Sequence, residues 1–519
     1  MVNDEPVTRS SESASPVKSF KFCNQTSALK TASHSESTQS SALSQRSSDE
    51  YGGVPYEEFE VQVQNLCHLL WPMPTVESRK PSAKRKRRRF VKALRKRDST
   101  LLKVSYKPKQ FIIEQMQGGG YNSVLGITII GQNDEVDARM VLRVPRMGVS
   151  PSDQDVTNLQ FVQEYLNLPT AEIIAYDFSD HNPLSSPYCI QSRISGHDLE
   201  SEKQSYPSLS HKQKLVFVEE FCETILLGLQ FVQYPWIGQI NKEKDGYTAS
   251  TFEIFQENAK LVAERVAQRA FFKVRPLGPE ELTSPQDPKD RLQVQSVLHF
   301  FEVQFGRHRN IEHHSADLDP STQWEETIWH RLVKAAKQMY DFGCLDCEYY
   351  CLTHYDLDPR NIMVEIQDEI PRITGIIDWD LACFAPDWVG CKPPMWIWNW
   401  LDGGSEDESR ANDEDTLTAE QKELKALFDG LVGLDFRYYA YEPHYRLARA
   451  MFKFARFGLP NEELRIEAQR VCEEWEVMYR EKQAVWEERE RVKANDGVDD
   501  VTSEQGGGDQ NGTEIGGMV

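Results

Sequence analysis

Short apolar runs of strand length recur between residues 111 and 194, and this pattern predicts a sheet. Short runs of Ile, Val and Leu are bounded by glycines and polar turns, as is typical of strands joined by tight connections. We expect a helix between the third and fourth strands, at residues 153–166, and an earlier one at residues 56–71 with an apolar face. The expected strands are residues 111–116, 124–130, 139–144, 168–175 and 187–194, and the apolar face comprises Phe59, Val63, Leu66 and Leu70.

Helical spacing of apolar residues dominates the second half of the chain. Prolines separate the runs, and a proline at position 443 suits the first turn of the helix that it begins. The expected helices are residues 210–233, 251–271, 290–305, 324–342, 420–431, 443–457 and 462–493. The order of elements is therefore strands first and helices afterwards.

One predicted hairpin interrupts the helices and carries the candidate chemistry. Residues 362–366 and 373–377 are expected to pair around a turn at 369–372, which returns Asp378 to the side of Asn361. Asp356 lies five residues before Asn361 in a loop that Pro359 keeps out of regular helix. Two carboxylates and an amide oxygen then converge. Phosphoryl transfer from a nucleotide uses such a set, with one carboxylate orienting the attacking hydroxyl and two oxygen ligands for Mg²⁺.

The residues at this hairpin resemble a known family. His354-x-Asp356-x-x-x-x-Asn361, followed by an apolar run and Asp378-Trp-Asp380, is similar to the aminoglycoside phosphotransferase and choline kinase branch of the protein-kinase-like fold. The resemblance covers roughly residues 56–492. It implies an α+β, two-lobed protein-kinase-like fold, with a small antiparallel β lobe and a larger, mainly helical lobe. It also implies Asp356 as the catalytic residue, Asn361 and Asp378 as Mg²⁺ ligands, and ATP or GTP as phosphate donor.

The glycine-rich segment after the first strand fits the same resemblance. Glycines let backbone N–H groups approach phosphate oxygens, although a tight turn is the alternative for such a segment alone. The segment resembles fungal members of the family in particular, as does the run Leu142-Arg-Val-Pro145. The residues expected to contact the nucleotide here are Gly118, Gly119, Gly120, Asn122 and Ser123.

A departure from the family concerns the cation on the third strand. Kinase-like proteins carry a Lys there, held by a Glu on the next helix, whereas this chain has Arg143 and, by alignment of the motif, Asp155. A longer cation opposite a shorter carboxylate could preserve the pair, and Glu164 is the alternative partner. Arginine binds phosphate as a planar fork, where lysine is a point charge. An exposed strand cation is the structural alternative for Arg143.

Charge and composition narrow the class of protein. The net charge of −22 argues against general nucleic-acid binding, and no apolar run is long enough for a membrane span. The first residues lack a basic region followed by an apolar one, which disfavours a secretory leader, and the early Asp4 and Glu5 disfavour a mitochondrial one. Ten scattered cysteines suit an intracellular protein. The expected location is cytoplasmic. The basic run 84–97 permits nuclear import or an anionic partner, with a solvated insertion as the alternative.

Four segments follow from these patterns. Low apolar content predicts disordered tails at residues 1–52 and 493–519. Residues 53–195, with a basic insertion at 79–97, are the expected N-terminal lobe, and residues 196–492 are the expected helical catalytic lobe.

Several alternatives remain open from the sequence. The leading hypothesis is a small-molecule kinase with a nucleotide and a hydroxyl-bearing acceptor as its partners. The second is a pseudokinase that binds nucleotide or acts as a scaffold, and a protein kinase is disfavoured because no Ala-Pro-Glu follows the motif. Asp358 and Arg360 could serve the acceptor side or be solvated loop charges. Two further alternatives are a zinc site at Cys344, Cys347, Cys351 and His354, and an aromatic cage at residues 393–400.

Overall fold

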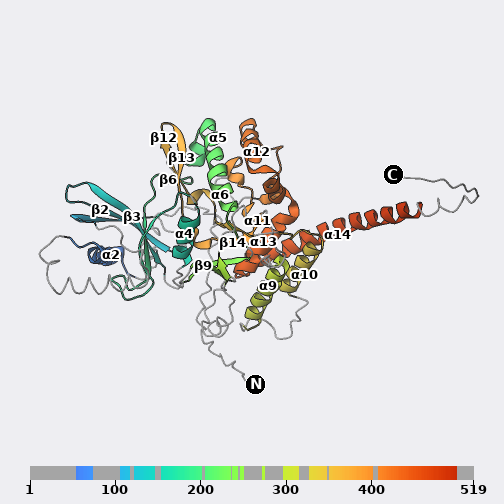
Figure 1. Cartoon of the computed structure of the whole chain (residues 1–519), viewed down its shortest axis with the longest axis horizontal. Coiled ribbons are helices and arrows are strands. Elements are labelled where there is room, and N and C mark those ends of the chain that lie inside the picture. The colour runs from blue at the N-terminus through green and yellow to red at the C-terminus, as the bar shows by residue number, and fades with distance from the viewer. Residues whose placement is uncertain are drawn as a thin grey trace, which may run out of the picture.

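The computed structural model describes most of the chain between residues 54 and 499. The described ranges are 54–73, 106–116, 122–146, 154–166, 168–201, 205–234, 236–243, 246–250, 272–274, 296–314, 327–347, 350–400 and 407–499. The predicted disordered segment 1–52, the basic insertion 79–97, the predicted helix 251–271 and residues 500–519 of the predicted C-terminal tail lie outside them. Residues 493–499, predicted to belong to that tail, instead continue the last helix. Figure 1 shows a sheet at one end of the molecule and most helices at the other.

The N-terminal part is a five-stranded antiparallel sheet with strand order β1-β2-β3-β5-β4. Helix α2 (Tyr56–Leu70) packs on this sheet, and Phe59, Val63, Leu66 and Leu70 are all buried, as their spacing predicted. Helix α4 (Gln154–Tyr165) follows the third strand. The strands are β1 (Gln110–Gln115), β2 (Asn122–Ile130), β3 (Val136–Pro145), β4 (Ile173–Asp177) and β5 (Tyr188–Ser192).

The C-terminal part is largely helical and has a core of its own. Its helices are α5 (His211–Glu220), α6 (Leu227–Gln230), α9 (Val297–His314), α10 (Ile328–Asp341), α11 (Asp387–Gly390), α12 (Ala419–Tyr441), α13 (Pro443–Phe457) and α14 (Glu462–Asp499). A π-helical turn at Phe221–Leu226 joins α5 to α6. An antiparallel sheet followed by a largely helical region confirms the predicted α+β, kinase-like fold class.

Two further sheets lie in the C-terminal part. Strands β12 (Ile362–Gln367) and β13 (Ile370–Ile376) form the predicted hairpin, and β6 (His197–Asp198) extends it. A six-stranded sheet, which the sequence pattern did not predict, has the order β10-β9-β8-β14-β11-β7. Its strands are β7 (Gln233–Tyr234), β8 (Gly238–Glu243), β9 (Gly246–Ser250), β10 (Phe272–Val274), β11 (Tyr350–Thr353) and β14 (Cys383–Pro386).

The pairing of β11 with β14 places the two motif loops side by side. Thr353 at the end of β11 is opposite Cys383 at the start of β14. The loop that leaves β11 and the loop that enters β14 therefore emerge at the same edge. The hairpin closes the arrangement, because the Ile377 N–H donates to the Asn361 carbonyl at 3.0 Å.

Gly196 fits the point where the chain passes from the first sheet toward the hairpin. Its φ of +89° lies in the region that favours glycine, and a Cβ at this position would collide with the Val364 carbonyl. The close approach lets His197 and Asp198 pair with β12.

Candidate active site

The loop after β11 is held from beneath by a buried histidine. His354 is 1% exposed, and its Nε2 lies 3.0 Å from the Ile377 carbonyl. Burial lowers the pKa of His354 to about 4, so the ring is neutral near pH 7 and Nε2–H donates to that carbonyl. The other ring nitrogen, Nδ1, accepts from the Asp356 N–H at 3.4 Å. His354 thus connects the two motif loops.

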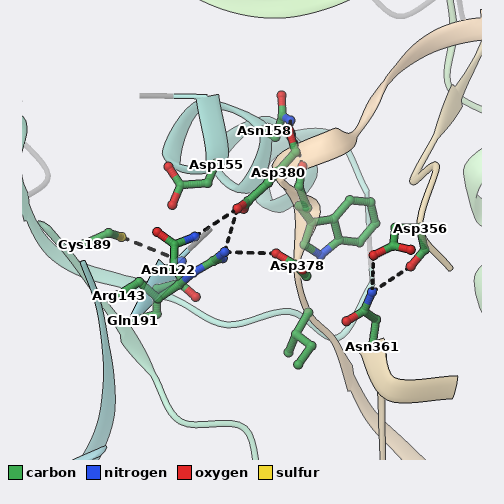
Figure 2. Close-up of polar contacts among 12 residues, drawn as sticks. Asn122, Arg143, Asp155, Asn158, Cys189, Gln191, Asp356, Asn361, Asp378 and Asp380 are labelled. Atoms are coloured by element: carbon green, nitrogen blue, oxygen red, sulfur yellow. Dashed lines mark hydrogen bonds and ion pairs between the residues drawn. The ribbon is translucent and has the colours of Figure 1, made fainter. Parts of the chain in front are cut away.

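Asp356 is oriented by the short helix that follows it. One turn of 3-10 helix at Pro359–Asn361 carries both of its partners. Arg360 Nη2 lies 2.6 Å from Asp356 Oδ1, and Asn361 Nδ2 lies 3.0 Å from Asp356 Oδ2. Each carboxylate oxygen therefore has one donor, and it keeps a lone pair that can accept a hydroxyl proton. Figure 2 shows Asn361 turned toward Asp356.

Asp378 and Asp380 lie on either side of Trp379 and are both bound by one cation. Arg143 Nη2 is 2.9 Å from Asp378 Oδ1 and 2.6 Å from Asp380 Oδ2 (Figure 2). Asp378 itself has a φ of +65°, a left-handed conformation that aspartate tolerates better than most residues. Because Arg143 belongs to β3, this contact joins the N-terminal sheet to the loop after β13.

Two amide side chains hold the same loop in place. Asn122, at the start of β2, donates through Nδ2 to Asp380 Oδ2 at 3.3 Å. Asn158 of α4 is fully buried, and its Nδ2 lies 2.7, 3.3 and 3.2 Å from the carbonyls of Trp379, Asp380 and Ala382. Gln154, one helical turn earlier, donates to Asn158 Oδ1 at 2.6 Å.

Burial and charge shift the pKa values of the acidic groups in one direction. Burial raises the pKa of Asp356 to about 6, while the Arg360 cation opposes the rise. Burial also raises the pKa of Asp155 and holds that of Asp380 well above its usual range, and Arg143 opposes both effects. For Arg143 itself, the carboxylates Asp380, Asp378 and Asp155 outweigh burial and raise the pKa. Arg143 is therefore charged at any pH at which the protein is folded.

Three of the residues predicted for the site line a common cavity. Arg143, Asp155 and Asp378 line one small cavity with Gln191 and Asp380. Within the described residues, the ion pairs of Arg143 go to Asp378 and Asp380 rather than to the predicted partner Asp155, which acts on Arg143 through its charge. Glu164, the alternative partner, is exposed near the end of α4.

Only part of the predicted glycine-rich phosphate segment lies within the described residues. Gly118, Gly119 and Gly120 lie outside the described residues, whereas Asn122 and Ser123 are placed at the start of β2. Ser123 is 2% exposed and its backbone pairs with Val144.

Sequence reasoning missed the buried amides Gln154 and Asn158. Their signal was available, because the two amides are four residues apart and lie among the apolar residues Val156, Leu159, Phe161 and Val162 of α4, which are buried. Buried amides need partners, which predicts a polar contact for this helix.

The donor set fits a hard divalent cation. Asp380 Oδ1 is buried and has no hydrogen-bond partner among the described residues, so this carboxyl oxygen can accept a further ligand. The Asn361 amide nitrogen is used for Asp356, which leaves Asn361 Oδ1 as an acceptor. Carboxylate and amide oxygens are the ligands that Mg²⁺ prefers. No group of three or more His, Cys, Asp or Glu side chains in the described ranges is arranged to hold a metal.

The two other sequence alternatives gain no support from the described part of the chain. Cys347 Sγ lies 3.5 Å from Asp387 Oδ1 and Cys351 Sγ lies 3.7 Å from the Gln230 carbonyl, so these thiols have protein partners rather than a shared metal geometry. Trp396 and Trp398 are 5% and 2% exposed and belong to the core, which is the alternative to an aromatic cage.

Comparison with known proteins agrees with the motifs. The sequence model of the Phosphotransferase enzyme family matches residues 131–388. Two curated proteins, both described as subtelomeric hrmA-associated cluster proteins of Aspergillus fumigatus, are 26% identical over 133 residues, which is 26% of this chain and 25% of each relative. The match thus spans about a quarter of the length of these relatives.

Solved structures give further similarities. An aminoglycoside phosphotransferase, APH(4)-Ia, in ternary complex with ADP and hygromycin B is 15% identical with a TM-score of 0.38, covering 74% of this chain and 96% of that one. Ethanolamine kinase of Plasmodium vivax is 12% identical with a TM-score of 0.37, covering 72% and 83%. Within the described ranges, none of the helices has the length and apolar character needed to cross a membrane.

Proposed function

Because this chain belongs to the phosphotransferase enzyme family, we propose that it transfers the γ-phosphate of a magnesium-bound nucleotide, ATP or GTP, to a hydroxyl of a small molecule. The observation that carries the proposal is the position of Asp356. Its carboxylate is held by Arg360 and Asn361, and it lies close enough to Asp378 for the two charges to interact. A proton acceptor thus adjoins the oxygen ligands that phosphoryl transfer requires.

The role proposed for Asp356 follows from its two hydrogen bonds. The acceptor hydroxyl donates to a free lone pair of the carboxylate, which orients its oxygen toward the γ-phosphorus and receives the proton as the O–P bond forms. Asn361 Oδ1 and Asp378 would hold Mg²⁺, which neutralises developing phosphate charge when bound. Asp380 would support the ligands from behind.

The remaining predicted contacts are assigned to the phosphates. The backbone N–H groups of Gly118–Gly120, with Asn122 and Ser123, would cover the phosphate chain from above. Arg143 would bind phosphate oxygens, and Asp155 would balance its charge from α4. This part of the proposal is supported by the place of Arg143, Asp155 and Asp378 on one cavity.

Thermal unfolding with and without nucleotide tests the proposal. Binding to the folded state raises the melting temperature by mass action, so we expect Mg-ATP or Mg-GTP at millimolar concentration to stabilise the protein. Asp378→Ala should lose this shift. Asp356→Ala should keep the shift and lose turnover, measured as nucleotide-diphosphate release with a panel of hydroxyl compounds. Absence of any shift with either nucleotide would contradict the proposal.

A nucleotide-binding pseudokinase is the second candidate. The observation that favours it is the pairing of Arg143 with the carboxylates of both Asp378 and Asp380, which occupies the proposed metal ligands. If the protein is a pseudokinase, nucleotide should stabilise it, but neither phosphorylation of an acceptor nor hydrolysis of the nucleotide should be detected. It also predicts that, in cells that lack the protein, the Asp356→Ala variant restores the lost function as well as the unchanged protein does.

A further inference from the structure

Arg143 makes contacts that its expected role does not explain. In the family pattern the strand cation serves the nucleotide phosphates, yet here one nitrogen, Nη2, contacts Asp378 Oδ1 at 2.9 Å and Asp380 Oδ2 at 2.6 Å. The Arg143 side chain is 13% exposed, whereas the side chains of Asp378 and Asp380 are 38% and 24% exposed, so the cation is held at the edge of the protein interior. Figure 2 shows the guanidinium reaching across to both carboxylates.

We propose that Arg143 acts as a latch, meaning that its ion pairs with Asp378 and Asp380 block the proposed metal site. It prevents a divalent cation from binding to Asp378 alone, and it moves aside when nucleotide phosphates supply it with another anionic partner. Metal and nucleotide then enter together. The inference rests on the proposed function, because it describes how the same nucleotide site is regulated.

Electrostatics explains why the latch excludes a lone metal ion. A guanidinium within 3 Å of Asp378 Oδ1 uses a lone pair of that oxygen and repels a second cation at the same place. The Arg143 charge cannot be removed by deprotonation, because arginine stays protonated at neutral pH. The contact with Asp380 holds the guanidinium in place from the other side.

The same geometry explains how the latch opens. One nitrogen bridges two carboxylates, so neither carboxylate receives the paired, parallel hydrogen bonds that make an arginine–carboxylate pair strongest. A phosphate chain can accept such a fork. When Arg143 moves to phosphate, Asp378 is free for the metal. Asn122 continues to hold Asp380 during the exchange.

Binding of Mn²⁺ without nucleotide tests the latch directly. The unbound ion is measured by electron paramagnetic resonance during titration of the full chain, which requires neither an acceptor nor turnover. We expect weak binding to the unchanged protein and binding about tenfold tighter or more to Arg143→Met, which removes the charge and keeps much of the volume. Equal affinities, or no binding to either protein, would overturn the latch.

Three variants identify the cause of any change. Arg143→Lys keeps the charge, so its Mn²⁺ affinity should stay near that of the unchanged protein. Arg143→Gln should behave like the Met variant, and it serves if Arg143→Met does not fold in a melting experiment. Asp378→Asn combined with Arg143→Met should lose the gained affinity. If it retains that affinity, the metal binds elsewhere and the latch is overturned.

Adding free guanidinium ion to the Arg143→Met variant replaces the missing side-chain cation and gives an independent test of the latch. Guanidinium ion at a low, non-denaturing concentration should weaken Mn²⁺ binding to Arg143→Met and leave the unchanged protein unaffected. The nucleotide melting experiment separates the two proposals. Tight Mn²⁺ binding to the unchanged protein overturns the latch even if nucleotide stabilises it. A missing nucleotide shift overturns the proposed function, and with it the release step, even if Mn²⁺ responds to Arg143 as expected.

Discussion

At the scale of single residues, Arg360 is the main group that opposes the effect of burial on the candidate base Asp356. Its guanidinium lies 2.6 Å from Asp356, where it opposes the burial that raises the pKa of this carboxyl to about 6. We predict that Arg360→Ala raises the pKa of Asp356 further. Less of the carboxylate is then ionised in acid, so turnover should fall several-fold below about pH 6.5 and much less at about pH 8. The measurement is the pH profile of nucleotide hydrolysis, with water as acceptor.

Arg360→Lys is the matched control for this prediction. It keeps a cation beside Asp356, and its profile should lie between those of the unchanged protein and the Ala variant. A uniform loss at every pH in Arg360→Ala would mean that Arg360 acts on the shape of the loop and not on the ionisation of Asp356.

The sequence predicted the positions of site residues better than their partners. Local chain geometry was enough to place Asp378 near Asn361, because one short hairpin separates them. The partners of Arg143 lie 235 and 237 residues away in the chain. They depend on how the N-terminal sheet is placed against the loop after β13, and no local pattern encodes that placement.

At the scale of elements, α4 is fixed to the loop of Asp378 and Asp380 by Asn158. This amide is fully buried and donates to backbone carbonyls at Trp379, Asp380 and Ala382. We predict that Asn158→Leu, which has a similar volume, lowers the free energy of unfolding by about 3 kcal/mol, because buried carbonyls lose their donor. Chemical denaturation measures the loss. The nucleotide melting shift should shrink as well, since the loop is no longer held in place.

Glu164→Leu supplies the comparison on the same helix. Glu164 is exposed, so this change should alter the free energy of unfolding by no more than about 0.5 kcal/mol. A loss of similar size in both variants would show that leucine in α4, rather than the missing amide, is responsible.

Elements with a clear apolar period were predicted well, and short elements between distant partners were not. Helices α10 and α13 and the β12–β13 hairpin lie close to their expected ranges, because each has a repeating pattern of its own. Strands β11 and β14 are four residues each and buried throughout, so they have no alternation to recognise. Their pairing is nevertheless what brings the two motif loops together.

At the scale of the whole molecule, two cores correspond to the two kinds of pattern in the chain. Short apolar strands, together with α2, build the core of the N-terminal sheet, and helical runs build the larger core of the C-terminal part. Figure 1 shows α14 continuing beyond this second core. The fold class could be predicted because each pattern is local. The six-stranded sheet could not, since its strands come from segments between residues 233 and 386.

Buried histidines in the helical core should make the whole molecule sensitive to acid. His308 of α9 is 5% exposed, stacks on Trp329 and lies 2.9 Å from the Ala455 carbonyl. Burial lowers its pKa to about 4, whereas in the unfolded chain it is about 6.5, so the unfolded state takes up the proton first as pH falls. The resulting stability is complete above about pH 6.5 and is lost progressively toward pH 4, by about 3 kcal/mol at most.

His308→Gln keeps a donor for Ala455 and cannot titrate. We predict that the unchanged protein loses more stability than this variant between about pH 7 and pH 4.5, measured by urea unfolding, and parallel losses in the two proteins would contradict the assignment.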